Sequence, residues 1–147
     1  MEKLKRYIHT AIFYALMAMA GGVFYREFTK YNHYSGRTTL AFVHTHYFIL
    51  GMLFFLLLMV LEKSFSFTDQ RTRRVLAAYH VGLNLTVVML TARGILQVKE
   101  ASVSSAVNAA VSGMAGIGHI VLCVSLILLL LRIRKCIYAS VMLMQWS

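Results

Sequence analysis

Six histidines are the residues of this sequence whose chemistry is hardest to explain by packing alone. Four of them fall within long apolar runs: His44, His46, His80 and His119. An ionisable side chain inside a membrane span is costly and is a candidate functional group by default. Neutral imidazole is a good ligand for haem iron, and two imidazoles on one iron give an electron-transfer centre. The histidines therefore direct attention to haem or metal binding.

The expected depths of His46 and His119 make them the predicted ligand pair. At about 1.5 Å per residue, His46 lies about 12 Å below Thr38, and His119 lies about 16 Å below Asn108. In an up-down-up-down bundle, the second and fourth helices are parallel and diagonally opposed. The sequence predicts that a b-type haem is held between these two imidazoles, non-covalently because no CxxCH motif is present. A structural role through hydrogen bonds is the alternative for each histidine alone.

Two glycines near His119 could admit a flat macrocycle. Gly113 and Gly116 remove side chains from the helix surface within two turns of His119. The alternative is close packing between helices, which small residues commonly provide in membranes.

Three arginines at the outer helix ends are predicted to pair with haem propionates: Arg26, Arg37 and Arg93. Arg93 is the strongest of these, because it lies about one and a half turns inside its helix and needs a counter-charge there. The alternative for Arg93 is that its long side chain reaches the outer headgroups. Glu27 offers it another partner within the protein.

The remaining histidines of the apolar runs leave several alternatives open. Residues two apart on a helix point about 200° away from each other, so His44 cannot share a site with His46. His44 is expected to reach an outer-loop carboxylate, a subunit interface or a second metal. His80 could hold a second haem together with His9, and a hydrogen bond between His80 and Asn84 is the alternative.

The elements that must position these residues are four membrane-spanning helices. Of the 147 residues, 59% are hydrophobic and 14% are charged, and the mean hydropathy is +0.69. Soluble domains average about 25% charged residues. The apolar residues form four blocks, at about 7–25, 38–61, 75–98 and 106–131, each long enough to cross a bilayer as a helix. We predict one all-α domain over residues 1–135, an up-down-up-down four-helix transmembrane bundle, followed by an apolar tail over 136–147 that could lie along the membrane interface.

The distribution of lysine and arginine predicts the orientation of the bundle. Ten of the fifteen fall in the N-terminus, the loop after the second block and the segment after the fourth block. Since short cytoplasmic loops carry the excess of positive charge, both termini are predicted to be cytoplasmic. The net charge of +10 then reflects topology and contact with anionic lipid. Cations spread over four separate segments do not predict nucleic-acid binding.

Four motifs of this sequence carry a family resemblance. They are Phe24–Lys30, Phe42–Met52, Ala92–Gln97 and Ser112–His119. Together they resemble a family of small bacterial four-helix membrane proteins catalogued as a domain of unknown function, over about Lys3 to Arg134. The resemblance implies the four-helix membrane fold and a location in the cytoplasmic membrane of a bacterium, and it brings no established activity.

A second resemblance concerns the histidine motifs alone. The His-x-His sequence followed by a glycine, with a lone histidine in a glycine-rich helix, is similar to the haem-holding helices of the catalytic subunit of haem–copper oxidases. In that family the His-x-His pair serves two haems from opposite helix faces. The clustered copper histidines of the oxidase are missing here, so the resemblance implies haem binding without oxygen reduction.

The leading hypothesis is an integral membrane haem protein for electron transfer, or for redox or gas sensing, with a quinone or another redox partner and possible self-association. One alternative is a copper or zinc site built from His44, His46, His119 and Cys123, which lies one turn beyond His119. Another is an accessory membrane subunit whose histidines only form hydrogen bonds. No nucleophilic triad or phosphate-binding glycine loop is present, so the sequence leaves open whether the chain is an enzyme.

Overall fold

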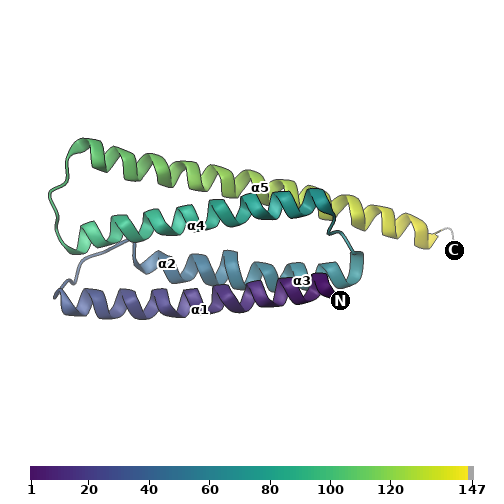
Figure 1. The fold of residues 1–147 in the computed structure, drawn as a ribbon, viewed down its shortest axis with the longest axis horizontal. Helices are drawn as coiled ribbons and strands as arrows, with labels where there is room; N and C mark the ends of the chain where they lie inside the picture. The colour runs from purple at the N-terminus through teal and green to yellow at the C-terminus, as the bar shows by residue number, and fades with distance from the viewer. Residues whose placement is uncertain (146–147) are drawn as a thin grey trace.

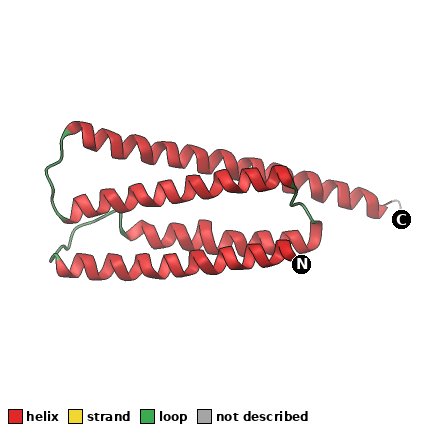
Figure 2. Ribbon diagram, in the orientation of Figure 1, coloured by secondary structure: helices red, strands yellow, loops and turns green. Residues whose placement is uncertain are grey.

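The computed structural model describes residues 1–145, which are almost entirely helical and contain no strand (Figure 2). In chain order the elements are α1 (Glu2–Tyr31), α2 (Ala41–His46), η1 (Tyr47–Leu53), α3 (Phe54–Phe65), α4 (Gln70–Val98) and α5 (Ser105–Gln145). Because α2, η1 and α3 follow one another without a break, they form one long helix (Figure 1). Within the described residues, four helices are long and apolar enough to cross a membrane, which confirms the predicted all-α four-helix fold.

Each of the four long helices extends past its predicted apolar block at one end or both, although the second begins at Ala41, three residues after the expected start. The largest extension is in α5, which continues past the expected end at Leu131 through most of the predicted tail (Figure 1). Its 41 residues correspond to a length of about 60 Å, roughly twice the hydrocarbon thickness of a bilayer. Residues 136–145 therefore continue a helix, whereas Trp146 and Ser147 lie outside the described residues.

The helices pack as two antiparallel pairs, α1 with α2–η1–α3 and α4 with α5. The N-terminal end of α2 docks on α4, where the hydroxyl of Thr38 donates to the carbonyl of Gly94 at 3.1 Å and that of Thr39 donates to the carbonyl of Leu90 at 2.7 Å. In contrast, α5 packs chiefly on α4 and touches α3 lightly, and within the described residues it makes no comparable backbone contact with α2. The N-terminal half of α5 therefore faces α2 without close backbone packing.

A π-helical segment, η1, begins directly after His46. A Cβ at Gly51 in this segment would lie 2.6 Å from the Tyr14 side chain, so only glycine allows α1 to approach so closely. The carbonyl of Leu50 accepts a hydrogen bond from the Tyr79 hydroxyl at 2.7 Å. Single turns of this type occur mostly inside α-helices and frequently at functional sites.

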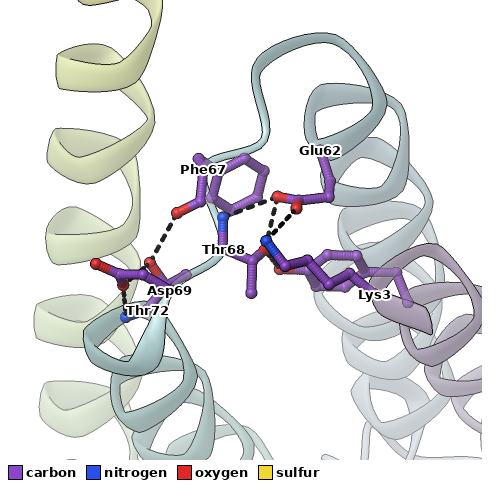
Figure 3. Close-up of polar contacts among 7 residues, drawn as sticks. Lys3, Glu62, Phe67, Thr68, Asp69 and Thr72 are labelled. Carbon is purple, nitrogen blue, oxygen red and sulfur yellow. Dashed lines mark hydrogen bonds and ion pairs between the residues drawn. The ribbon is translucent and has the colours of Figure 1, made fainter. Parts of the chain in front are cut away.

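One end of the bundle carries the N-terminus, the loop after Phe65, and Arg132, and we call it the basic end. A buried carboxylate, that of Glu62, connects the elements that meet there (Figure 3). Glu62 is only 4% exposed and accepts the Thr68 backbone N–H at 2.8 Å and the Thr68 hydroxyl at 2.7 Å. The Lys3 ammonium lies 3.3 Å from the other carboxylate oxygen. Since the Thr68 hydroxyl donates to Glu62, the Tyr7 hydroxyl donates to Thr68 at 2.6 Å. Glu62 thus joins α1, α3 and the loop before α4.

Asp69 begins α4 as its N-cap. Its carboxylate accepts the Thr72 backbone N–H at 2.7 Å and the Thr72 hydroxyl at 2.9 Å, and it also pairs with Arg132 of α5. The hydrogen bonds from Thr72, helped by Arg132, lower the pKa of Asp69 to about 2. The carboxylate therefore stays ionised at physiological pH, and it fixes both the start of α4 and the position of α5.

Candidate functional site

The structure brings His46 and His119 together across the bundle. Their ring centroids lie 6.3 Å apart, and the ring planes are perpendicular. His46 is the last residue of α2, whereas His119 lies 73 residues further along the chain in α5. Both side chains remain partly or largely exposed in the described chain, so the space around them is not filled by protein.

Both imidazoles have the same hydrogen-bond pattern, and it determines their tautomer. Nδ1 of His46 lies 2.7 Å from the carbonyl oxygen of Phe42, and Nδ1 of His119 lies 2.8 Å from that of Ala115. A carbonyl oxygen only accepts, so Nδ1 must be the donor in each ring. A neutral imidazole with its proton on Nδ1 has a lone pair on Nε2, which is the state that binds a metal.

The spacing of the two rings suits two ligands on opposite sides of one metal. A metal–imidazole bond is about 2.0–2.1 Å long, so two trans imidazoles on one metal have centroids about 6 Å apart. Residues 1–142, whose side chains the structure describes, contain no group of three or more His, Cys, Asp or Glu side chains that could hold a metal ion. Haem needs only two protein ligands, whereas a bare zinc ion takes three or four.

The glycines of α5 divide into two kinds. A Cβ at Gly118 would lie 2.7 Å from the Thr86 hydroxyl oxygen, so Gly118 serves the close packing of α4 and α5. A Cβ at Gly113 or Gly116 would meet no heavy atom of the described residues within 4 Å. Close helix packing therefore accounts for Gly118 and not for the other two. At about 100° per residue, Gly116 lies about 60° around the helix from His119 and Gly113 about 120°, so Gly116 is the nearer to the imidazole face.

Arg93 crosses from α4 to α5. Its guanidinium donates to the Asn108 side-chain oxygen at 2.8 Å, to the Asn108 carbonyl at 3.2 Å and to the Ser112 hydroxyl at 2.5 Å. Ser112 precedes His119 by seven residues, so it lies on the same helix face, about 10 Å nearer the N-terminal end of α5. The positive charge of Arg93 is thus placed above the histidine pair on the same face. Glu27 is not its partner, which corrects that alternative, because Glu27 pairs with Arg26 at 3.7 Å.

The other two predicted propionate partners are exposed. Arg26 lies near the end of α1, and Arg37 lies in the following loop. None of the three arginines bonds to His46 or His119 in the part of the chain that the structure describes, and Arg93 is the one that bonds to α5 on the face of His119. The pairing of these arginines with haem propionates stays a prediction.

His44 points towards α1, away from His119. A Cβ at Gly22 of α1 would lie 3.7 Å from the Cβ of His44. Nδ1 of His44 is buried and has no hydrogen-bond partner among the described residues. The expected contact with an outer-loop carboxylate is therefore not found, and His44 and His46 face different helices, as residues two apart on a helix must.

A network of tyrosines and one asparagine is the part of the interior that the sequence did not reveal. The Tyr47 hydroxyl donates to the Asn84 side-chain oxygen at 3.0 Å, and the Asn84 amide donates to the Tyr14 hydroxyl at 3.0 Å. The Tyr14 hydroxyl lies 2.6 Å from Nδ1 of His80. The Asn84 amide also donates to the backbone carbonyl of His80 at 2.8 Å. Two signals of this network were present in the sequence. One was the alternative of a hydrogen bond between His80 and Asn84, which the structure shows as a bond from the Asn84 amide to the His80 backbone carbonyl. The other was that buried tyrosine hydroxyls require partners.

Comparison with known proteins places the chain in a family and gives it no activity. No curated protein and no solved structure matches it. The similarity to haem–copper oxidase helices therefore stays a prediction. A family model described as a protein of unknown function (DUF2871) matches residues 4–136, well over half of the chain, so this four-helix protein belongs to that family.

Proposed function

We propose that this protein holds a b-type haem between α2 and α5, with His46 and His119 as its axial ligands. The observation that carries the proposal is the shared hydrogen-bond pattern of the two imidazoles. Each Nδ1 donates to a carbonyl of its own helix, and each Nε2 keeps a lone pair. The rings come from different helices and lie 6.3 Å apart.

The residues around the two histidines provide the space and the positive charge that a flat, anionic macrocycle would require. Gly116 leaves open space beside His119, and Arg93 sets a positive charge about 10 Å above it, which would stabilise an anionic propionate of a bound haem. Haem would supply a one-electron ferric–ferrous couple at this position. With His46 and His119 both holding the iron, the site would supply electron transfer, whereas gas sensing would require one of the two imidazoles to leave; the arrangement therefore favours electron transfer.

A bare copper or zinc site has less support. It would require His44 and Cys123 to join the pair, and His44 faces α1. No cluster of three ligands is present in the described chain. The two-ligand arrangement therefore favours haem.

An absorption spectrum tests the proposal directly. The full-length protein is purified in detergent from haem-sufficient cells and examined oxidised and then reduced with dithionite. We expect a sharp Soret band and, on reduction, split visible bands typical of two axial imidazoles. A colourless protein that also takes up no added haemin would contradict the proposal. A colourless protein that contains stoichiometric copper or zinc would support the bare-metal alternative instead.

We infer that the bundle lies in the cytoplasmic membrane of a bacterium with its basic end inside. The N-terminus, the loop between α3 and α4 and the segment after Arg132 carry most of the cations and lie at that end. Excess lysine and arginine in short loops favours retention on the cytoplasmic side.

Reporter fusions test this orientation. Alkaline phosphatase, which is active only outside the cytoplasm, should be inactive when fused after Ser147 and active when fused after Asn32 in a truncated chain. A green fluorescent protein that folds only in the cytoplasm should give the reverse pattern at the same two positions and serves as the control. Active phosphatase at the C-terminus and inactive phosphatase after Asn32 would contradict the charge-based orientation.

A further inference from the structure

A second candidate site lies between α1 and α4 at the basic end. The cavity has a volume of about 680 Å³, within the usual range for small-molecule sites. Apolar side chains of α3 and α4 form part of its wall, namely Phe55, Leu76 and Ala77. Hydrogen-bond donors and cations also line it, and they include Lys3, Arg6, Arg73 and His80. Glu2 is the only carboxylate among its described lining residues.

The tyrosine network determines which nitrogen of His80 carries the proton. The Asn84 amide is oriented by two neighbours, since its oxygen accepts from Tyr47 and its nitrogen donates to the carbonyl of His80. The same nitrogen donates to the Tyr14 hydroxyl, whose one other hydrogen-bond partner among the described residues is Nδ1 of His80 at 2.6 Å. Since Nδ1 is the acceptor available to the hydroxyl hydrogen, we assign Tyr14 as the donor. Nδ1 is therefore an acceptor, and the neutral imidazole carries its proton on Nε2.

His80 thus has the opposite tautomer to His46 and His119. His46 and His119 offer a lone pair on Nε2, whereas His80 offers an N–H donor. An imidazole protonated on Nε2 is not a metal ligand at that atom, which argues against a second haem held by His80 and His9. The Phe55 ring stacks on the imidazole with centroids 4.9 Å apart and planes inclined by 12°, so the imidazole is held in one orientation.

The hydrogen-bond donors of the cavity lie at two depths, with the arginines near its mouth and His80 further inside. They indicate a ligand that has one hydrogen-bond acceptor at each depth. Arg73 precedes His80 by seven residues on the same face of α4, so it lies about 10 Å nearer the basic end. A lipid phosphate at the cavity mouth would satisfy the arginines and leave the deeper N–H of His80 without a partner. A flat ring with carbonyl oxygens on opposite edges can reach both levels while its faces contact the apolar wall.

We propose that this cavity binds the head group of a membrane quinone. One carbonyl oxygen accepts the Nε2 proton of His80, and the opposite carbonyl faces Arg6 and Arg73 at the mouth. Binding at this site does not depend on haem at the outer site. The link between the two sites rests on the proposed function: the Tyr14 ring lies 5.7 Å from that of His80 and 5.5 Å from that of Tyr47, which directly follows His46.

Binding of decylubiquinone to the full-length protein tests the proposal. The protein is placed in phosphatidylcholine nanodiscs, whose lipid carries no net charge, and titrated by calorimetry whether or not it is coloured. We expect saturable binding with one quinone per chain. His80→Leu should weaken the affinity by about tenfold, the typical effect of losing one hydrogen bond in a buried site. His80→Gln, which can present an amide N–H near the same position, should retain most of it.

Two further variants separate the site from general damage to the fold. Tyr14→Phe keeps the ring and removes the hydroxyl that fixes the tautomer of His80, so it should also weaken binding. Tyr79→Phe is the matched control, because Tyr79 is another buried tyrosine, its hydroxyl bonds to the Leu50 carbonyl, and it does not line the cavity. Its affinity for the quinone should equal that of the unmodified protein.

Two results would overturn the proposal. One is the absence of saturable binding in the unmodified protein. The other is an affinity that is unchanged in His80→Leu, is lost in the double variant Arg6→Gln/Arg73→Gln and is competed away by phosphatidylglycerol. That second pattern would identify a site for an anionic lipid phosphate. Because the titration reads quinone binding alone, its failure is distinct from a colourless protein, which bears only on the haem proposal.

Discussion

Replacing either His46 or His119 with alanine is expected to abolish the low-spin haem spectrum. Each substitution would remove one of the two imidazoles that hold the iron, and the haem should become high-spin or be lost, since the other imidazole of α2, that of His44, lies against α1 near Gly22. Absorption spectra and haem content of the purified variants provide the measurement. Free imidazole added to the alanine variants should restore part of the low-spin spectrum, which a merely misfolded variant would not show.

His44→Ala is the matched control for this pair. It removes an imidazole from the same helix, two residues away, but that imidazole contacts α1 near Gly22 and points away from His119. The spectrum should therefore remain low-spin. If His44→Ala abolished the spectrum while His46→Ala left it unchanged, the face of α2 towards α1 would hold the cofactor. If both changed it, two centres on opposite faces of α2 would be the better description.

Gly116→Leu examines the same site without touching the iron ligands. The new side chain would enter space that no described residue occupies within 4 Å of the Cβ, so the fold should tolerate it while haem content falls. Gly118→Leu, two residues away, should instead disturb the fold, because its Cβ would meet Thr86 at 2.7 Å. Full haem content in the Gly116 variant would show that the macrocycle does not lie against this face of α5.

Glu62→Ala is expected to lower the stability of the bundle more than any other substitution of an acidic residue at the basic end. It leaves the Thr68 N–H, the Thr68 hydroxyl and Lys3 without their acceptor, and the site is only 4% exposed (Figure 3). Removing one partner from a buried charged network costs about 3–5 kcal/mol. Glu62→Gln keeps one acceptor oxygen and loses the charge, so its loss of stability should be smaller.

Thermal unfolding of the detergent-solubilised variants, followed by circular dichroism, measures this effect. Glu2→Ala is the control, because Glu2 is exposed and pairs with Lys5 only at 3.9 Å. Exposed ion pairs typically contribute less than about 1 kcal/mol, so this variant should unfold close to the unmodified protein. Equal unfolding temperatures for Glu62→Ala and Glu2→Ala would show that the carboxylate does not hold the basic end together.

The four spans could be predicted from the sequence because the membrane simplifies the problem. In hydrocarbon each segment must satisfy its own backbone hydrogen bonds, so an apolar run of sufficient length is a helix whatever it packs against. The helix ends were less predictable, since the water-facing turns are not bound by that requirement. Gln70 begins α4 because Asp69 caps it, and α5 passes Leu131 as one continuous helix.

Part of the candidate site also followed from counting along the helices. Spacing alone required His44 and His46 to face different directions, and it gave His46 and His119 similar depths on diagonal helices. The structure brings those two rings within 6.3 Å. Counting could not reveal that Gly118 packs against Thr86 while Gly116 faces open space, because the difference depends on where α4 and α2 lie.

The sequence by itself determined the four helices, the difference in positive charge between the two ends of the bundle, and the choice of imidazoles as the unusual groups. The tertiary structure decided what each imidazole can do. His46 and His119 donate from Nδ1 to carbonyls of their own helices and keep a lone pair on Nε2, whereas Tyr14, 66 residues away from His80, donates to its Nδ1 and leaves the proton on Nε2. The same side chain becomes a metal ligand or a hydrogen-bond donor according to its neighbour, because a neutral imidazole has one proton for two nitrogens.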